Sequence, residues 1–172
     1  MAASIILIGM PGSGKTTVGK AIASRLHLSF CDTDDLIVTL TGEKLQDTLN
    51  RCGREGFLEL ERKALLSYEP SGRTVIATGG SAVLHPDAME HLKSIGTVVF
   101  LDADLPLLRK RLWNVESRGI VSGDSDDVIV SVYREREPLY YRYSDIRIHI
   151  RGKNVRSIAD EILRKADSVD RK

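Results

Sequence analysis

The residues best suited to chemistry form one glycine-rich stretch near the start of the chain. Its pattern is Gly9-x-x-x-x-Gly14-Lys15-Thr16, in which glycines let the backbone curl around an anion. Lys15 can reach the outer phosphates of a nucleotide, and the Thr16 hydroxyl can ligate Mg²⁺. The stretch therefore predicts a site for a nucleoside triphosphate.

The elements on either side of this loop must position it. Residues 5–8 form a short apolar, β-branched run that suits a fully buried strand, and residues 18–26 can form a helix. The helix N-terminus would aim backbone N–H groups and its positive dipole end at one point. The alternative is a chance glycine-rich turn, which we disfavour because strand, loop, Lys-Thr and helix follow in the right order.

Two acidic residues, Asp32 and Asp34, follow the next predicted strand, at residues 28–31. Phosphoryl transfer needs positioned phosphates, Mg²⁺, a stabiliser of developing charge and an oriented acceptor. One acid could join the metal shell or take the acceptor's proton, while the other holds a substrate hydroxyl. The structural alternative is an Asx turn or helix N-cap, with Asp35 able to cap a helix at residues 36–40. We favour function, because ligands sit at the carboxyl ends of parallel strands.

Two later segments could complete such a site. Gly79 and Gly80 follow a strand at residues 74–78, which suggests a backbone that approaches a ligand, although a tight turn explains them nearly as well. Residues 114–127 have little apolar periodicity and contain Arg118, which fits a lid that expels water and delivers a cation to phosphates. A disordered insertion is the alternative, and the sequence leaves that choice open.

Composition excludes several classes of protein. The 172 residues are 42% hydrophobic and 28% charged, as expected for one soluble globular domain. The net charge of +1 gives no global field for nucleic acid, and no stretch approaches the ~20 apolar residues of a membrane span. Cys31 and Cys52 lack metal-ligand spacing and fit a reducing, cytoplasmic setting. The histidines form no ligand pattern and are expected at the surface or in packing: His27, His85, His91 and His149.

The order of the predicted elements implies an α/β fold. Strands alternate with helices, which predicts a five-stranded parallel sheet covered on both faces, a three-layer αβα domain. The strands are expected at 5–8, 28–31, 74–78, 97–101 and 146–150. The helices are expected at 18–26, 36–40, two segments broken near Gly53, 87–94, 105–113, 128–140 and 155–166.

In order along nearly the whole chain, these residues resemble the shikimate kinases, small P-loop kinases of the nucleoside monophosphate kinase type. The matching pieces are Gly9 to Lys20, Asp32-Thr33-Asp34, Gly53 with Phe57 and Glu61, Gly79-Gly80, Arg118, and Arg136 to Tyr140. The resemblance implies one kinase domain over 1–172, with a lid at about 114–127 and substrate-binding helices at about 35–62. It also implies transfer of the ATP γ-phosphate, with Mg²⁺, to the 3-hydroxyl of shikimate, a small carbocyclic acid, in aromatic amino acid biosynthesis.

The resemblance also assigns roles to individual residues. Those that would bind the nucleotide are Gly12, Ser13, Gly14, Lys15, Thr16, Thr17, Arg111, Arg118 and Asn154, with Arg111 and the turn from Arg151 to Asn154 flanking the adenine. Those at acceptor-pocket positions are Asp34, Leu58, Glu61, Gly79, Gly80, Ser81 and Arg136. The catalytic set would be Lys15, Asp32, Asp34 and Arg118. Asp32 would share the metal with Thr16 and is a candidate base, Asp34 would bind the acceptor hydroxyl, and Arg136 would pair with the substrate carboxylate.

Three positions depart from the family pattern. After Phe57 the family has an arginine that grips the substrate carboxylate and leans on the acid three residues later, whereas this chain has Leu58. The family's third glycine is Ser81, and the proline after the lid arginine is Gly119. Losing one charge-assisted partner costs about 1.5–3 kcal/mol, or roughly one to two decades of affinity.

With Leu58 in place of the family's arginine, Glu61 lacks the partner that the family pattern gives it. Two hypotheses follow. In the first, Arg54 or Arg62 replaces the missing guanidinium. In the second, Glu61 meets a substrate ammonium while Arg136 keeps a carboxylate, as in a kinase for an amino acid or amino-polyol.

Three functions are therefore expected candidates, each for a monomer without nucleic-acid or membrane partners. The first is a shikimate kinase. The second is a kinase of the same fold for another small hydroxylated acceptor, such as homoserine, a sugar acid or a nucleotide. The third is a non-catalytic nucleotide-binding module, although such a module has no use for the acceptor-side acid Asp34.

Overall fold

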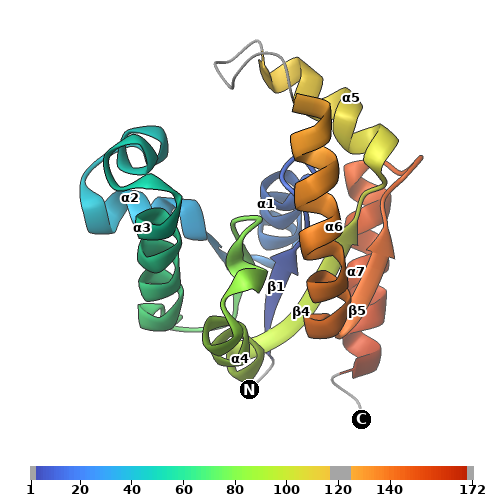
Figure 1. Ribbon diagram of the computed structural model, residues 1–172. Coiled ribbons are helices and arrows are strands. Elements are labelled where there is room, and N and C mark those ends of the chain that lie inside the picture. The colour runs from blue at the N-terminus through green and yellow to red at the C-terminus, as the bar shows by residue number, and fades with distance from the viewer. Residues whose placement is uncertain (1–2, 117–124, 170–172) are drawn as a thin grey trace.

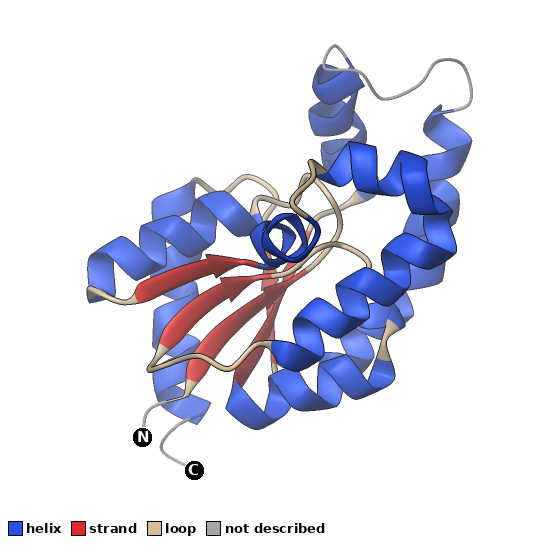
Figure 2. Ribbon diagram, turned by 90° about the vertical axis from the view of Figure 1, so that its left-hand side faces the viewer, coloured by secondary structure: helices blue, strands red, loops and turns tan. Residues whose placement is uncertain are grey.

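The computed structural model describes residues 3–116 and 125–169. Within these residues, five parallel strands form one sheet in the order β2-β3-β1-β4-β5. The strands are β1 (Ser4–Ile8), β2 (Ser29–Asp32), β3 (Thr74–Ala77), β4 (Gly96–Asp102) and β5 (Ile146–His149). Helices cover both faces of the sheet (Figure 2). The predicted α/β class and all five predicted strands are confirmed.

The strand that leads into the glycine-rich loop lies at the centre of the sheet. All five residues of β1 are buried, because β3 and β4 flank it and helices cover it above and below. Ile6 lies beside Ile76 on one side and Val98 on the other. This apolar surrounding explains why the segment is an uninterrupted apolar run rather than an alternating one.

The helices are divided between the two faces of the sheet and a separate pair beside it (Figure 1). Helices α1 (Lys15–Leu26) and α7 (Val155–Val169) pack together on one face, and α4 (Pro86–Ile95) and α6 (Ser125–Tyr143) contact β4 from the other. Helix α5 (Leu105–Glu116) packs on α6. The separate pair is α2 (Thr33–Thr41) and α3 (Leu45–Ser67), which covers residues 35–62; a role of this pair in substrate binding stays a prediction.

The predicted break in the third helix is confirmed. Gly53 has φ 68° and ψ −178° inside α3, a conformation that interrupts the helix and that other residues rarely adopt. A short 3₁₀ helix, η1 (Ala82–Leu84), follows β3 and has no counterpart among the predicted elements. Among the described residues, no helix is long and apolar enough to cross a bilayer.

The predicted lid at 114–127 is helical at both ends. Helix α5 continues to Glu116 and α6 begins at Ser125, so both helices extend further than predicted. Arg118 and Gly119 lie outside the described residues, and the lid and the role of Arg118 remain predictions.

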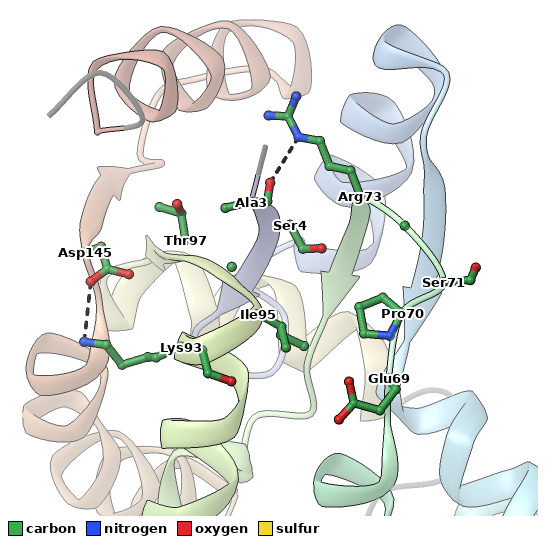
Figure 3. A pocket seen from close by; sticks show the side chains of 13 residues that line it. Ala3, Ser4, Glu69, Pro70, Ser71, Arg73, Lys93, Ile95, Thr97 and Asp145 are labelled. Carbon is green, nitrogen blue, oxygen red and sulfur yellow. Dashed lines mark hydrogen bonds and ion pairs between the residues drawn. The ribbon is translucent and has the colours of Figure 1, made fainter. Parts of the chain in front are cut away.

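A hollow of about 610 Å³ lies at the edge of the sheet formed by the amino ends of the strands (Figure 3). Its charged side chains have partners within the protein. Arg73 Nε donates to the Ala3 carbonyl at 3.0 Å, and Lys93 Nζ lies 3.4 Å from an Asp145 carboxylate oxygen. Ligands of parallel α/β sheets bind at the opposite, carboxyl edge, where the glycine-rich loop lies.

Candidate active site

The glycine-rich loop is folded around the ammonium group of Lys15. Lys15 Nζ donates to the carbonyls of Gly9 at 2.8 Å and Met10 at 2.9 Å. The loop can curl this tightly because Gly9, Gly12 and Gly14 all have positive φ angles. Gly14 is the N-cap of α1, so the positive end of this helix faces the same region as the lysine. The loop therefore has the backbone geometry that binds phosphates.

Burial lowers the pKa of Lys15 to about 8, and the nearby carboxylates of Asp34 and Asp32 oppose that shift. Removing an ammonium from water disfavours its charged form. At neutral pH the lysine is still protonated and available to anionic phosphates.

The lowered pKa of Lys15 predicts that ATP binding takes up a proton near pH 8.5. Bound phosphates favour the charged lysine and raise its pKa, so affinity for ATP should fall as the pH rises above about 8. Titration calorimetry in buffers of different ionisation enthalpy measures this uptake. Lys20→Gln, a change at an exposed lysine of the same helix, should leave the uptake unchanged. Equal heats in all buffers would contradict the prediction.

Asp32 takes the structural role that the sequence offered as the alternative, while its functional role stays a prediction. Its Oδ2 accepts a hydrogen bond from Thr16 Oγ1 at 2.8 Å, and its Oδ1 accepts one from the Asp34 N–H at 3.2 Å. The second bond makes Asp32, rather than Asp35, the N-cap of α2. Helix α2 therefore begins at Thr33, earlier than the predicted residue 36.

The Thr16–Asp32 pair also fits the oxygen chemistry of Mg²⁺. A hydroxyl and a carboxylate oxygen lie side by side next to the phosphate-binding loop. Mg²⁺ is commonly held by one or two protein oxygens together with substrate phosphates and waters, so this donor set suits it. Among residues 3–116 and 125–169, no group of three or more His, Cys, Asp or Glu side chains could hold a metal ion alone.

The carboxyl group of Asp34 is shifted toward neutral pH. Burial and the negative charges of Asp32 and Glu61 raise its pKa to about 6, while Lys15 opposes the shift. A carboxylate whose pKa lies close to the working pH is suited to accepting a proton during a reaction.

Glu61 on α3 is almost completely buried, with 1% of its surface exposed. Its Oε1 accepts a hydrogen bond from Ser81 Oγ at 2.9 Å, and its Oε2 forms one with His85 Nε2 at 3.1 Å. His85 is buried, as the packing alternative predicts, and it also bonds a carboxylate that lines the cavity. The sequence held no signal for it, because these three residues come from separate elements.

The expected replacements for the missing arginine are engaged elsewhere. Arg62 Nε donates to Asp87 at 2.9 Å, and Arg54 Nη2 lies 3.5 Å from a Glu135 carboxylate oxygen. Within the described part of the chain neither contacts Glu61, so the hypothesis of a replacement arginine is wrong. A neutral hydroxyl and an imidazole take its place.

Replacing His85 by Ala is expected to lower the free energy of unfolding by about 1–3 kcal/mol, because one buried oxygen of Glu61 loses its partner. Urea denaturation followed by circular dichroism measures the change. His85→Gln keeps an N–H donor and should restore part of the lost stability. An alanine variant as stable as the wild type would show that this bond contributes nothing.

The turn after β3 contains glycine because side chains close in on it. A Cβ on Gly79 would collide with the Glu61 carboxylate and lie 3.2 Å from Asp34 Oδ1. A Cβ on Gly80 would lie 2.7 Å from the ring of Pro11 in the glycine-rich loop. The Tyr140 hydroxyl on α6 also donates to the Gly80 carbonyl at 2.7 Å, a clamp that the sequence did not indicate. Both glycines therefore lie close to the protein's own side chains, and their approach to a ligand stays a prediction.

A cavity of about 690 Å³ joins these groups into one site. It brings together most of the predicted residues: Gly12, Gly14, Lys15, Thr16, Thr17, Asp32, Asp34, Glu61, Gly79, Gly80, Ser81 and Arg136. Leu45, Phe57 and Thr78 complete its wall with Pro11. Leu58, although half-buried, does not line the cavity.

Arg136 reaches the cavity from α6. Its side chain is 12% exposed, and its buried Nε has no hydrogen-bond partner among the described residues. The same atom lies 3.8 Å from a Glu135 carboxylate oxygen, too far for a hydrogen bond. This guanidinium can therefore still bind an anionic group in the cavity.

Of the residues predicted to flank the adenine, one lies over the glycine-rich loop and two have partners elsewhere in the protein. Arg111 Nη1 donates to the Gly12 carbonyl at 2.9 Å, so it does lie over the glycine-rich loop. Arg151 pairs with Asp104 at 2.9 Å. Asn154 Oδ1 accepts the Ser157 N–H at 2.8 Å, so this side chain caps the start of α7.

Known proteins resemble this chain over almost its full length. The family model described as shikimate kinase matches residues 11–167. A shikimate kinase of Syntrophus aciditrophicus is 39% identical over 96% of this chain and 91% of its own length. Threonine synthase-like 1 of Pongo abelii is 38% identical over 93% of this chain, but only 22% of that protein is covered.

Solved structures agree with the sequence matches. The structure of shikimate kinase from Acinetobacter baumannii in complex with shikimate superposes with a TM-score of 0.89 at 29% identity. The alignment covers all of this chain and 97% of the other. The fold, the order of the strands and the family match agree, and this chain belongs to the shikimate kinase family.

Proposed function

We propose that this protein transfers the γ-phosphate of ATP to the 3-hydroxyl of shikimate. The observation that carries the proposal is the convergence of Lys15, Asp34 and Arg136 on one cavity beside the glycine-rich loop. A phosphate-binding cation, a carboxylate and a second cation for an acidic substrate are the parts that this reaction requires. The family match and the shikimate-bound relative support this choice of acceptor.

In the proposed reaction the chain mainly positions and neutralises charge. Lys15 and the backbone N–H groups of the loop bind the phosphates, and Arg136 pairs with the carboxylate of the acceptor. Thr16 and Asp32 would hold Mg²⁺, which neutralises negative charge on the phosphates when it is bound. Asp34 takes the proton of the attacking hydroxyl, because its raised pKa suits this role better than the helix-capping geometry of Asp32.

A coupled assay of ADP release with shikimate tests the proposal directly. We expect ADP formation that depends on shikimate, with a phosphorylated product seen by ³¹P NMR. Quinate, gluconate and nucleoside monophosphates serve as competing acceptors. ATP binding without ADP release on any acceptor would contradict the proposal and favour the non-catalytic nucleotide-binding module.

The pH profile is expected to have an acidic limb near pH 6. Asp34 must be ionised to accept the proton, so kcat/KM for the acceptor at saturating ATP should fall about tenfold per pH unit below that point. The measurement is a set of initial rates between pH 5 and 8, and a rate unchanged down to pH 5 would contradict the role of Asp34.

A further inference from the structure

The acceptor side of the cavity carries more negative than positive charge among the described residues. Of the charged groups that line the cavity, Lys15 and Asp32 belong to the phosphate-binding side. The remaining charged groups are the carboxylates of Asp34 and Glu61 and the guanidinium of Arg136. A ligand that offers only a carboxylate satisfies the guanidinium and brings no cation to the second acid.

No arginine of α3 pairs with Glu61 in the described part of the chain. Ser81 supplies a neutral hydroxyl, and His85 supplies an imidazole 3.1 Å away that is cationic only when it is protonated. The residue that could have carried a guanidinium is Leu58, outside the cavity wall. Arg54 and Arg62 hold Glu135 and Asp87 instead. A buried carboxylate that keeps its charge is strongly stabilised by a cationic partner, because water no longer screens it.

The two acids lie close enough to hold neighbouring groups of one small molecule. Oxygen atoms of Glu61 and Asp34 both approach the point where a Cβ on Gly79 would lie. An ammonium and a hydroxyl a few bonds apart can therefore meet Glu61 and Asp34 together.

From this arrangement we infer that the protein also phosphorylates a hydroxylated amino acid, a zwitterion held with its carboxylate on Arg136, its ammonium on Glu61 and its hydroxyl on Asp34. This inference rests on the proposed kinase function, since it uses the same ATP site. The hydroxyl oxygen forms a bond to the γ-phosphorus as the bond from that phosphorus to the bridging oxygen breaks. ADP leaves with the electron pair, and the hydroxyl proton passes to Asp34.

The test compares three acceptors in the ADP-release assay: L-homoserine, 4-hydroxybutyrate and shikimate. The first two differ only in the ammonium group. A charge-assisted contact with Glu61 predicts a kcat/KM for homoserine roughly 10- to 100-fold above that for 4-hydroxybutyrate. Equal turnover of the two, or turnover of shikimate alone, would overturn this inference and leave the shikimate kinase proposal standing. If no acceptor is turned over, both fail, whereas turnover of homoserine without shikimate supports the inference and overturns the proposed acceptor.

Two variants identify the residue responsible. Glu61→Gln keeps an oxygen for Ser81 and removes the charge, so the preference for homoserine over 4-hydroxybutyrate should disappear. Leu58→Arg places a guanidinium one turn of α3 from Glu61 and should lower kcat/KM for homoserine while raising it for shikimate. Thermal unfolding and ATP affinity verify that each variant is folded. A preference for homoserine that survives in both variants would overturn the assignment of Glu61.

Discussion

Asp34→Asn is expected to abolish most of the activity and, at the same time, to raise the melting temperature. Loss of a general base typically costs 10²- to 10⁴-fold in rate. The stability gain follows because the ionised carboxylate is buried beside Asp32 and Glu61, which makes its charge unfavourable in the folded state. Affinity for ATP should change little, since Lys15 keeps its carbonyl partners in the loop.

The direction of the stability change follows from the pKa of Asp34 in the folded and unfolded protein. The pKa of Asp34 is about 6 in the folded protein and near its ordinary value of 3.8 when unfolded, so ionisation destabilises the folded state as the pH rises through this interval. The penalty at neutral pH is about 2–3 kcal/mol, which corresponds to roughly 4–12 °C for a chain of this size. The gain of the asparagine variant should therefore vanish below about pH 4.

Differential scanning calorimetry and the ADP-release assay measure the two effects. Asp35→Asn is the matched control, because Asp35 is exposed on the same turn of α2. That change should alter stability by no more than about 0.5 kcal/mol. An Asp34 variant that melts below the wild type, or that keeps its full rate, would contradict the assignment.

Gly79→Ala is expected to reduce kcat/KM for the acceptor by about 100-fold or more. The added methyl group would collide with the carboxylate of Glu61, which cannot yield freely because Ser81 and His85 hold both of its oxygens. Displacing reacting groups by about 1 Å can cost 100-fold in rate, and overpacking costs a further 1–3 kcal/mol of stability, approximately.

Gly72→Ala provides the control for this substitution. A Cβ on Gly72 would meet no heavy atom within 4 Å, and its backbone is outside the left-handed region. We expect unchanged kinetics and a stability that is equal or slightly higher, by about 0.4–1 kcal/mol. Steady-state kinetics and thermal unfolding of both variants make the comparison. Activity within a few-fold of the wild type in Gly79→Ala would show that the turn can relax.

The nucleotide side of the site could be predicted from sequence because its determinants are local. The loop from Gly9 to Thr16 carries its glycines, lysine and hydroxyl within one strand–turn–helix unit. The strands could also be predicted from the sequence, because both faces of a parallel sheet are covered and its strands are therefore apolar runs. Asp32 lines the predicted cavity, and it rather than Asp35 caps α2, a choice that the sequence leaves open because any of three nearby aspartates could serve.

The hydrogen bonds around Glu61 on the acceptor side could not be predicted in the same way. Glu61, Ser81 and His85 come from α3, from the residue before η1 and from the residue before α4, and their contacts exist only after the chain has folded. Arg62 follows Glu61 directly in sequence, yet adjacent residues of a helix point in different directions, so it pairs with Asp87 on α4. Proximity in sequence was a misleading guide there.

The central position of β1 also has a consequence for synthesis of the chain. Ile5 pairs with Val75 on one side and Thr97 on the other, so the first strand made waits for two strands that are translated much later. At about 5–20 residues per second, this delay is on the order of ten seconds. Until then the apolar run of β1 has two unpaired edges, which is the condition that promotes aggregation of nascent chains. The segment that seats the nucleotide loop thus waits longest of the five strands for its partners.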